Sequence, residues 1–122
     1  MVEEYIQVLT SVNDEKKASE IANAILERRV AACVQILGPI LSSYWWKGKI
    51  EQAKEWICLA KAKTEDYEEL QAVIRSIHPY EVPEILATPI AYGNPEYLNW
   101  VRDETSQNTR VTLNNLSNSH KE

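Results

Sequence analysis

The chain has 122 residues and a formal charge of −5, with 44% hydrophobic and 25% charged residues. This size and composition predict one globular domain with a real core, and no apolar run approaches the roughly 20 residues that cross a bilayer. Its lysines and arginines are scattered among acidic residues, which argues against nucleic acid as a partner because phosphate binding needs clustered cations. The N-terminal residues form neither a basic nor an apolar leader, so we predict no membrane association and a cytoplasmic location.

A strand and an amphipathic helix are predicted first. Residues 5–10 are rich in β-forming side chains. Asn13 is expected to cap the helix that follows. The apolar stripe of that helix has helical spacing and consists of Ala18, Ile21, Ala22, Ile25 and Leu26.

Two strand-like arms of sixteen residues, 31–46 and 49–64, flank a predicted turn at Lys47-Gly48. At roughly 3.3 Å per residue each arm extends about 50 Å, whereas ordinary strands have about five or six residues. Such a ribbon overhangs any sheet that this chain can form, and its tip carries three adjacent aromatic residues. An exposed ribbon of this kind aggregates unless it is covered. We therefore predict self-association as a homotrimer, with a dimer as the alternative.

Gly38-Pro39 interrupts the first arm, and a bulge or bend is expected there. The register set by the two-residue turn places Cys58 opposite Leu37 and Cys33 opposite Ala62. The cysteines are then too far apart for a disulfide, so two small buried thiols are expected.

A second helix is predicted to open at Thr64 and to end at His78, because Pro79 disfavours helical geometry in the residue before it. Residues 84–91 are largely apolar and indicate a fourth strand. Pro89 places that strand at an edge or a bulge.

Asn94-Pro95 is a cap followed by proline at the first helical position, which predicts a short third helix. From Asp103 onward the chain is polar, and this segment is expected to be either mobile or a short added strand. We assign residues 1–104 to the folded domain and residues 105–122 to a polar tail.

The order of these elements is β-α-β-β-α-β followed by the extra helix. Right-handed crossovers then give an α+β fold of the ferredoxin-like type, with a four-stranded antiparallel sheet and both helices on one face. The other face of the sheet remains open. Sister subunits are the predicted cover.

Rigid aromatic side chains suit a subunit interface, and five of them are assigned to it: Tyr44, Trp45, Trp46, Trp56 and Trp100. A ligand cleft beside this interface is the alternative role. Such a cleft draws on Trp46, Lys63, His78, Tyr80 and Glu81.

His78 and Glu81 are the best candidates for binding a divalent ion, because Pro79 and Pro83 hold an imidazole, the Tyr80 phenol and a carboxylate within four residues. The alternative is structural, with His78 capping helix carbonyls and Glu81 paired with a lysine. A small anion or metabolite is a third option for this loop.

An enzyme is not predicted. The chain has no glycine-rich phosphate loop and no serine in a nucleophile elbow, and its second histidine, His120, lies in the polar tail. Cys33 and Cys58 lie in apolar strands, where a thiolate is disfavoured.

Four segments, residues 29–34, 43–50, 78–84 and 97–101, together resemble the CutA-type divalent-cation tolerance family. The resemblance implies a cytoplasmic homotrimer with a ferredoxin-like fold, similar in shape to PII-type nitrogen signalling trimers. It also implies a link to copper and other divalent metals, without an established enzymatic activity and without a cofactor needed for folding.

Two departures from the family pattern weaken the copper assignment. Some bacterial relatives have a cysteine at the end of the first strand and a histidine pair before the proline, where this chain has Thr10 and Ile77-His78. Copper favours thiolate, thioether or imidazole ligands. Two hypotheses remain: weak metal binding at His78 and Glu81, or a PII-like sensor or scaffold that binds a small ligand between subunits.

Overall fold

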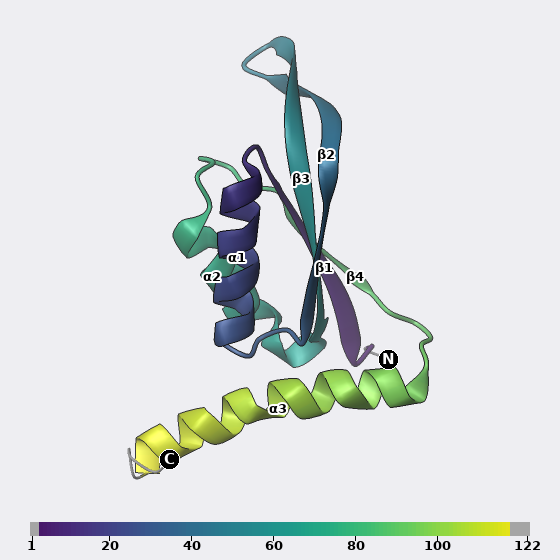
Figure 1. Cartoon of the computed structure of the whole chain (residues 1–122), viewed down its shortest axis with the longest axis vertical. Helices are drawn as coiled ribbons and strands as arrows, with labels where there is room; N and C mark the ends of the chain where they lie inside the picture. Colours follow the sequence, from purple (N-terminus) through teal and green to yellow (C-terminus); the bar gives the residue numbers. More distant parts are fainter. Residues whose placement is uncertain (1–2, 118–122) are drawn as a thin grey trace.

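The computed structural model describes residues 3–117 of the chain. Its elements are, in order, β1 (Tyr5–Val12), α1 (Glu15–Glu27), β2 (Cys33–Trp46), β3 (Lys49–Lys63), a 3-10 turn (Thr64–Asp66), α2 (Tyr67–Ile77), β4 (Ile85–Pro89) and α3 (Pro95–Ser117). All strand pairs are antiparallel, and the order in the sheet is β2-β3-β1-β4. Helices α1 and α2 lie on one face of this sheet (Figure 1). The predicted α+β arrangement is therefore confirmed.

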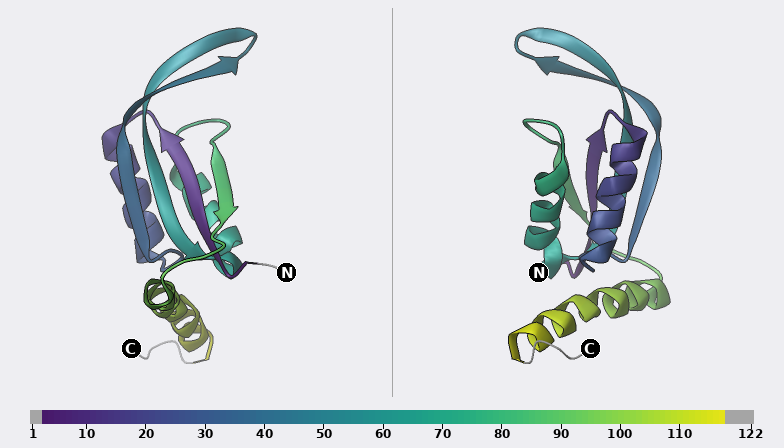
Figure 2. Two further views of the ribbon diagram at one scale, coloured as in Figure 1. Left: turned by 90° about the vertical axis from the view of Figure 1, so that its right-hand side faces the viewer. Right: turned by 60° about the vertical axis from the view of Figure 1, so that its left-hand side comes forward.

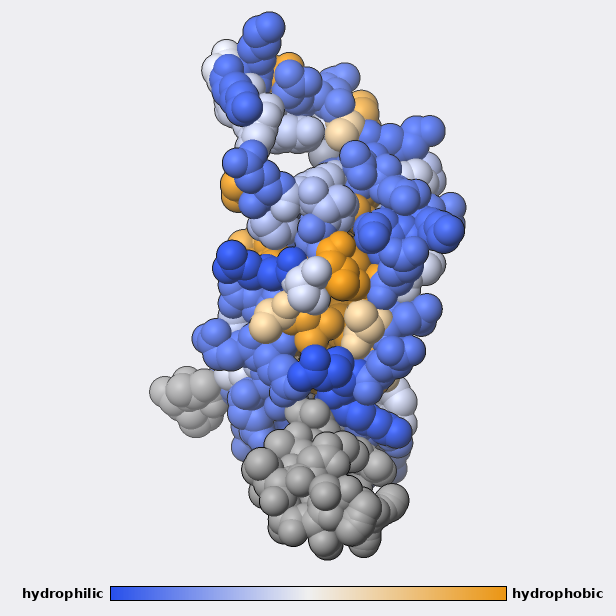
Figure 3. Space-filling view, turned by 90° about the vertical axis from the view of Figure 1, so that its left-hand side faces the viewer, coloured by the Kyte–Doolittle hydropathy of each residue, from blue (hydrophilic) through white to orange (hydrophobic). Residues whose placement is uncertain are grey.

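The core lies between the sheet and these two helices. Alternate β1 residues, Ile6, Val8 and Val12, face inward and meet the buried stripe of α1 and α2, for example Ile25 and Ile74. The outward surface of this helical layer is mainly hydrophilic, with one smaller hydrophobic patch (Figure 3). Helices α1 and α2 therefore cover one face of the sheet, and exposed apolar side chains remain on the opposite face.

The helix ends follow local capping chemistry. Asp14, and not Asn13, caps α1, because the Asp14 carboxylate accepts a hydrogen bond from the Lys16 amide at 3.3 Å. The predicted cap of α3 is confirmed, with the Asn94 side chain accepting from the Glu96 amide at 2.9 Å. Helix α2 ends at His78, which has an extended backbone, as Pro79 requires.

Strands β2 and β3 form a ribbon that extends beyond the other two strands (Figures 1 and 2). Both turn residues have positive φ, 52° at Lys47 and 81° at Gly48, as the two-residue hairpin turn requires. β1 pairs with β3 only from Trp56 to Lys63, so residues 49–55 of β3 pair, among the described strands, with β2 alone. We call the segment 40–55 the overhanging ribbon.

The predicted bulge is present, between Leu37 and Ile40. It adds one residue to β2, so Cys33 lies opposite Lys61 and Cys58 lies opposite Ile36. The predicted cysteine pairings were therefore wrong by one position. Both thiols are free, and burial raises the pKa of Cys58 to about 11, which disfavours its thiolate.

Helix α3 continues to Ser117 across the predicted domain boundary at residue 104, so the alternative of an added strand is wrong. After Pro95 the sequence of this helix contains neither glycine nor proline, the two residues that most disfavour a helix interior, so the helix can continue. Arg102 donates to the Tyr5 hydroxyl at 3.2 Å and Arg29 to the Glu104 carboxylate at 2.9 Å, which ties the helix to the domain. Residues 118–122 of the predicted tail lie outside the described part.

Candidate functional site

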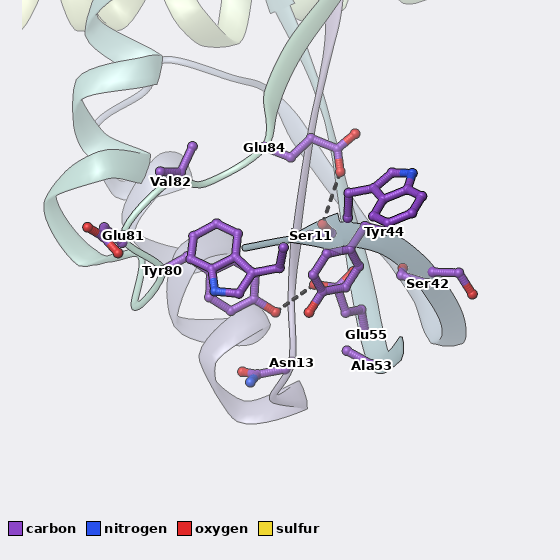
Figure 4. A pocket seen from close by; sticks show the side chains of 13 residues that line it. Ser11, Asn13, Ser42, Tyr44, Ala53, Glu55, Tyr80, Glu81, Val82 and Glu84 are labelled. Carbon is purple, nitrogen blue, oxygen red and sulfur yellow. Dashed lines mark hydrogen bonds between the residues drawn. The ribbon is translucent and has the colours of Figure 1, made fainter. Parts of the chain in front are cut away.

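A pocket of about 630 Å³ lies where the overhanging ribbon leaves the sheet. Its walls come from the end of β1, from β2 and β3, and from the loop between α2 and β4 (Figure 4). The residues that line it include Ser11, Asn13, Ser42, Ser43, Tyr44, Trp46, Glu55, Tyr80, Glu81, Val82 and Glu84. Pockets of several hundred Å³ are of the size that holds small molecules.

A buried carboxylate, Glu55, lies in the wall of this pocket. Only 5% of Glu55 is exposed, and its Oε2 accepts a hydrogen bond from the Tyr80 hydroxyl at 2.6 Å. In Figure 4, Tyr44 and Tyr80 both extend toward Glu55. Burial and this carboxylate raise the pKa of Tyr80, so the phenol remains a hydrogen-bond donor.

His78 lies behind Tyr80 and positions it. The imidazole Nε2 is 2.9 Å from the Ser11 carbonyl oxygen, and Nδ1 accepts from the Tyr80 amide at 3.2 Å. These partners fix the tautomer with the proton on Nε2, because a carbonyl only accepts and an amide only donates. Burial lowers the pKa of His78, partly offset by the Ser11 carbonyl and by Glu55, so the ring favours its neutral form.

Three of the five predicted cleft residues, Trp46, Tyr80 and Glu81, line the pocket, and His78 supports it from behind. Lys63 does not belong to it. Lys63 lies opposite Tyr5 at the other end of the sheet, eight residues from Glu55, where its buried ammonium is 3.5 Å from Glu65 and 3.6 Å from Asp66. Eight strand residues correspond to about 26 Å.

Sequence reasoning missed Glu55, Tyr44 as a pocket residue, and Ser11, whose hydroxyl donates to Glu84 at 3.2 Å. One signal was available for Glu55. It alternates with Ala53, Ile57 and Leu59, so an acidic side chain stands between apolar positions on one face of β3.

Four of the five predicted interface aromatics are exposed: Tyr44 at 43%, Trp45 at 72%, Trp46 at 40% and Trp100 at 42%. The fifth, Trp56, packs against the core of its own chain and against Gly38. The interface role of these residues stays a prediction.

The donor set of one chain does not fit a metal site. Within residues 3–117, no three histidine, cysteine, aspartate or glutamate side chains converge in a way that could hold an ion. Both ring nitrogens of His78 already have hydrogen-bond partners, and Glu81 is exposed. A metal ion at His78 therefore requires the imidazole to release the Ser11 carbonyl or the Tyr80 amide.

Residues 6–104 match the model of the CutA1 divalent ion tolerance protein family. The chain is 44% identical over 98 residues to a divalent-cation tolerance protein CutA of Thermus thermophilus, a match covering 80% of this chain and 95% of that protein. It is 47% identical over 92 residues to protein CutA of Mus musculus, covering 75% of this chain and 52% of the mouse protein. The chain thus spans about half the length of the mouse relative.

Solved structures agree with these matches. A divalent cation tolerance protein from Thermus thermophilus superposes with a TM-score of 0.80 at 42% identity, covering 82% of this chain and 97% of that one. A structure from Archaeoglobus fulgidus, described as a periplasmic divalent cation tolerance protein CutA, superposes with a TM-score of 0.81 at 35% identity, covering 83% and 98%. Among the described helices of this chain, none has the length and apolar character to cross a membrane.

Proposed function

Because this chain belongs to the CutA1 divalent ion tolerance family, we propose that it serves tolerance toward divalent cations as a cytoplasmic homotrimer that binds a small ligand. In this proposal the protein is a sensor or scaffold and not a tight metal-binding protein. The observation that carries it is the pocket beside the overhanging ribbon, which is walled by aromatic and polar side chains but, within the described residues, lacks a converging set of metal donors.

The exposed surface of the overhanging ribbon supports the homotrimer. Trp45, Leu41 and Ile50 are 72%, 69% and 64% exposed, and β3 pairs with no described strand other than β2 over residues 49–55. Leu37 and Leu86 are also exposed, at 48% and 56%, on the sheet face opposite the helices. Burial of these surfaces by sister subunits removes apolar area from water and closes the edges of the ribbon.

The position of the pocket supports ligand binding between subunits. Tyr44 and Trp46 belong both to its wall and to the ribbon that the trimer is proposed to cover. A ligand held there contacts the ribbon directly, and a neighbouring subunit packed on that ribbon responds to the same contact.

Weak copper binding at His78 and Glu81 is the second candidate. Neutral imidazole is a suitable copper ligand, and the low pKa of His78 favours that form, but both of its nitrogens have partners in this structure. Copper titration of the purified protein, followed by the histidine NMR signals, tests this candidate. Binding that is unchanged in His78→Ala rejects the site.

A formal charge of −5 supports the absence of nucleic-acid partners, and a cytoplasmic location agrees with two free thiols. No catalytic step is proposed, because the buried Cys58 thiol and the neutral, fully bonded His78 are poor nucleophile candidates.

Native mass spectrometry of protein purified gently from its own cells tests the proposed function. We expect a trimer that retains a small organic molecule, lost when Tyr80 and Trp46 are both changed to alanine. A trimer that carries only metal, or carries nothing, would contradict the sensor proposal and leave weak metal binding as the better account.

A further inference from the structure

The wall of the pocket is acidic. Glu55, Glu81 and Glu84 line it, and among the described residues no lysine, arginine or histidine does. In the described part of the chain, none of these three carboxylates forms an ion pair. The pocket therefore presents a negative potential to whatever enters it.

Glu55 strengthens this negative potential, because its carboxylate is buried and poorly screened by water. It is 95% removed from solvent, and its hydrogen-bond donor within the described residues is the neutral Tyr80 hydroxyl. A buried carboxylate without a cation is costly, because desolvation is compensated only in part by one hydrogen bond. A positive group that enters the pocket beside Glu55 compensates that cost and gains binding free energy from it.

The aromatic walls favour the same kind of ligand. Tyr44, Trp46 and Tyr80 supply π faces, which attract cations, most strongly where water is excluded. One of these rings already interacts with an ammonium group, because the Nζ of Lys47 lies 5.8 Å from the centre of the Trp46 ring. Ser42 and Asn13 add neutral polar groups that can bind hydroxyl or amide groups of a ligand.

We infer that the pocket selects a small organic ammonium compound. The inference deepens the proposed function, on which it rests, by naming the chemical class of the ligand. Three carboxylates, with no lysine, arginine or histidine among the described lining residues, disfavour a small anion. A bare divalent ion lacks a third converging donor there, whereas an alkylated ammonium needs only one carboxylate and aromatic faces.

Choline and its neutral isostere 3,3-dimethylbutan-1-ol provide a matched pair of probes, because they have nearly the same shape and differ in charge. Binding to the trimeric protein is measured by isothermal titration calorimetry at low ionic strength. Choline is expected to bind at least about tenfold more tightly than the isostere. Equal affinity for the two probes would overturn the inference.

Glu55→Gln removes the charge and keeps an oxygen that can accept from Tyr80. This variant is expected to lose about tenfold in choline affinity and to bind the neutral isostere unchanged. Glu96→Gln makes the same change of charge on α3, outside the pocket, and serves as the control. Unchanged choline affinity in Glu55→Gln, with the melting temperature of the protein preserved, would also overturn the inference.

Citrate and ATP separate a failure of this inference from a failure of the proposed function. If these anions bind at the pocket and choline does not, the ligand class is wrong although the pocket is a ligand site, and another subunit must supply cations. If no probe of any charge binds and native mass spectrometry finds no retained molecule, both the inference and the proposed ligand function fail.

Discussion

Two regions of the sheet differ in how their side chains are covered: the overhanging ribbon, and the rest of the sheet with helices α1 and α2, which we call the body. In the body, β1 pairs on both sides, and alternate side chains such as Val8, at 1% exposure, contact α1 and α2. In the ribbon, β2 and β3 pair only with each other among the described strands, and Ile50 is 64% exposed. One chain thus buries one face of the sheet in the first region, whereas apolar side chains of the ribbon remain exposed.

The candidate pocket lies at the junction of the two regions. Glu55 is the first β3 residue beyond the part that pairs with β1, and it meets Tyr80 from the loop after α2. Tyr44 and Trp46 come from the ribbon. A ligand at this junction is thus in contact with a rigid body and with a segment whose surroundings depend on assembly.

The largest expected effect on stability comes from the body. Ile25→Ala empties a site that is 1% exposed, and we expect it to lower the free energy of unfolding by about 2–5 kcal/mol. Urea titration followed by circular dichroism measures this loss. Ile25→Val is the control, expected to cost about 0.5–1.5 kcal/mol, and equal effects of the two variants would contradict the close packing described for the core.

A substitution at the junction between body and ribbon should reduce the free energy of unfolding by a smaller amount. A Cβ added at Gly38 would lie 2.5 Å from Cδ1 of Trp56, so Gly38→Ala forces this ring to move. We expect a loss of about 1–3 kcal/mol in the free energy of unfolding. Combining it with Trp56→Leu should recover part of the loss, and strictly additive effects in the double variant would show that this contact is not the cause.

A ribbon substitution should change assembly and not the fold of the single chain. Ile50→Ser removes an exposed apolar side chain, so at dilutions where the chain is monomeric we expect a change within about 0.5 kcal/mol. At higher concentration the same variant should shift the particle mass downward in light scattering. Glu51→Ser, at the neighbouring position, is the control. Identical particle masses for both variants would show that the apolar side chain of Ile50 does not contribute to assembly.

The smallest effect is expected from pH. The pKa of His78 is lower in the folded protein than its ordinary value near 6.5, so the unfolded state binds more protons as pH falls through that value. Protonation of this group therefore does not reduce the free energy of unfolding above about pH 6.5. Below that value the free energy of unfolding falls as the pH falls, and the loss becomes constant below the pKa of the folded state. Unfolding measured at pH 7.5 and 5.5 should show a smaller decline in His78→Gln; an equal decline would contradict the buried, neutral assignment.

The fold was predictable because its signals are local. The apolar stripes of the helices, the turn at Lys47-Gly48 and the cap at Asn94 each depend on residues close together in the sequence. The cysteine pairing failed because a bulge shifts the register by one residue, and a turn-based count cannot place that shift. The helical continuation after residue 104 was also missed, since polar composition was taken to oppose a helix.

The candidate site was predictable only in part, because its contacts join distant segments. Trp46, Tyr80 and Glu81 line the pocket, and their binding role stays a prediction. The contacts of His78 could not be predicted, because its partner is the Ser11 carbonyl, 67 residues away in the sequence. The hydrogen bond between Tyr80 and Glu55 spans 25 residues. Lys63 was assigned to the cleft, but the length of β3 carries it to the opposite end of the sheet.

Sedimentation equilibrium of the purified protein at micromolar concentration tests most directly whether the ribbon is completed by sister subunits. The account predicts a single species of about 42 kDa, three times the 14.0 kDa of one chain. A stable 14.0 kDa particle under these conditions would contradict it, and would leave the exposed ribbon and its half of the pocket without the proposed cover.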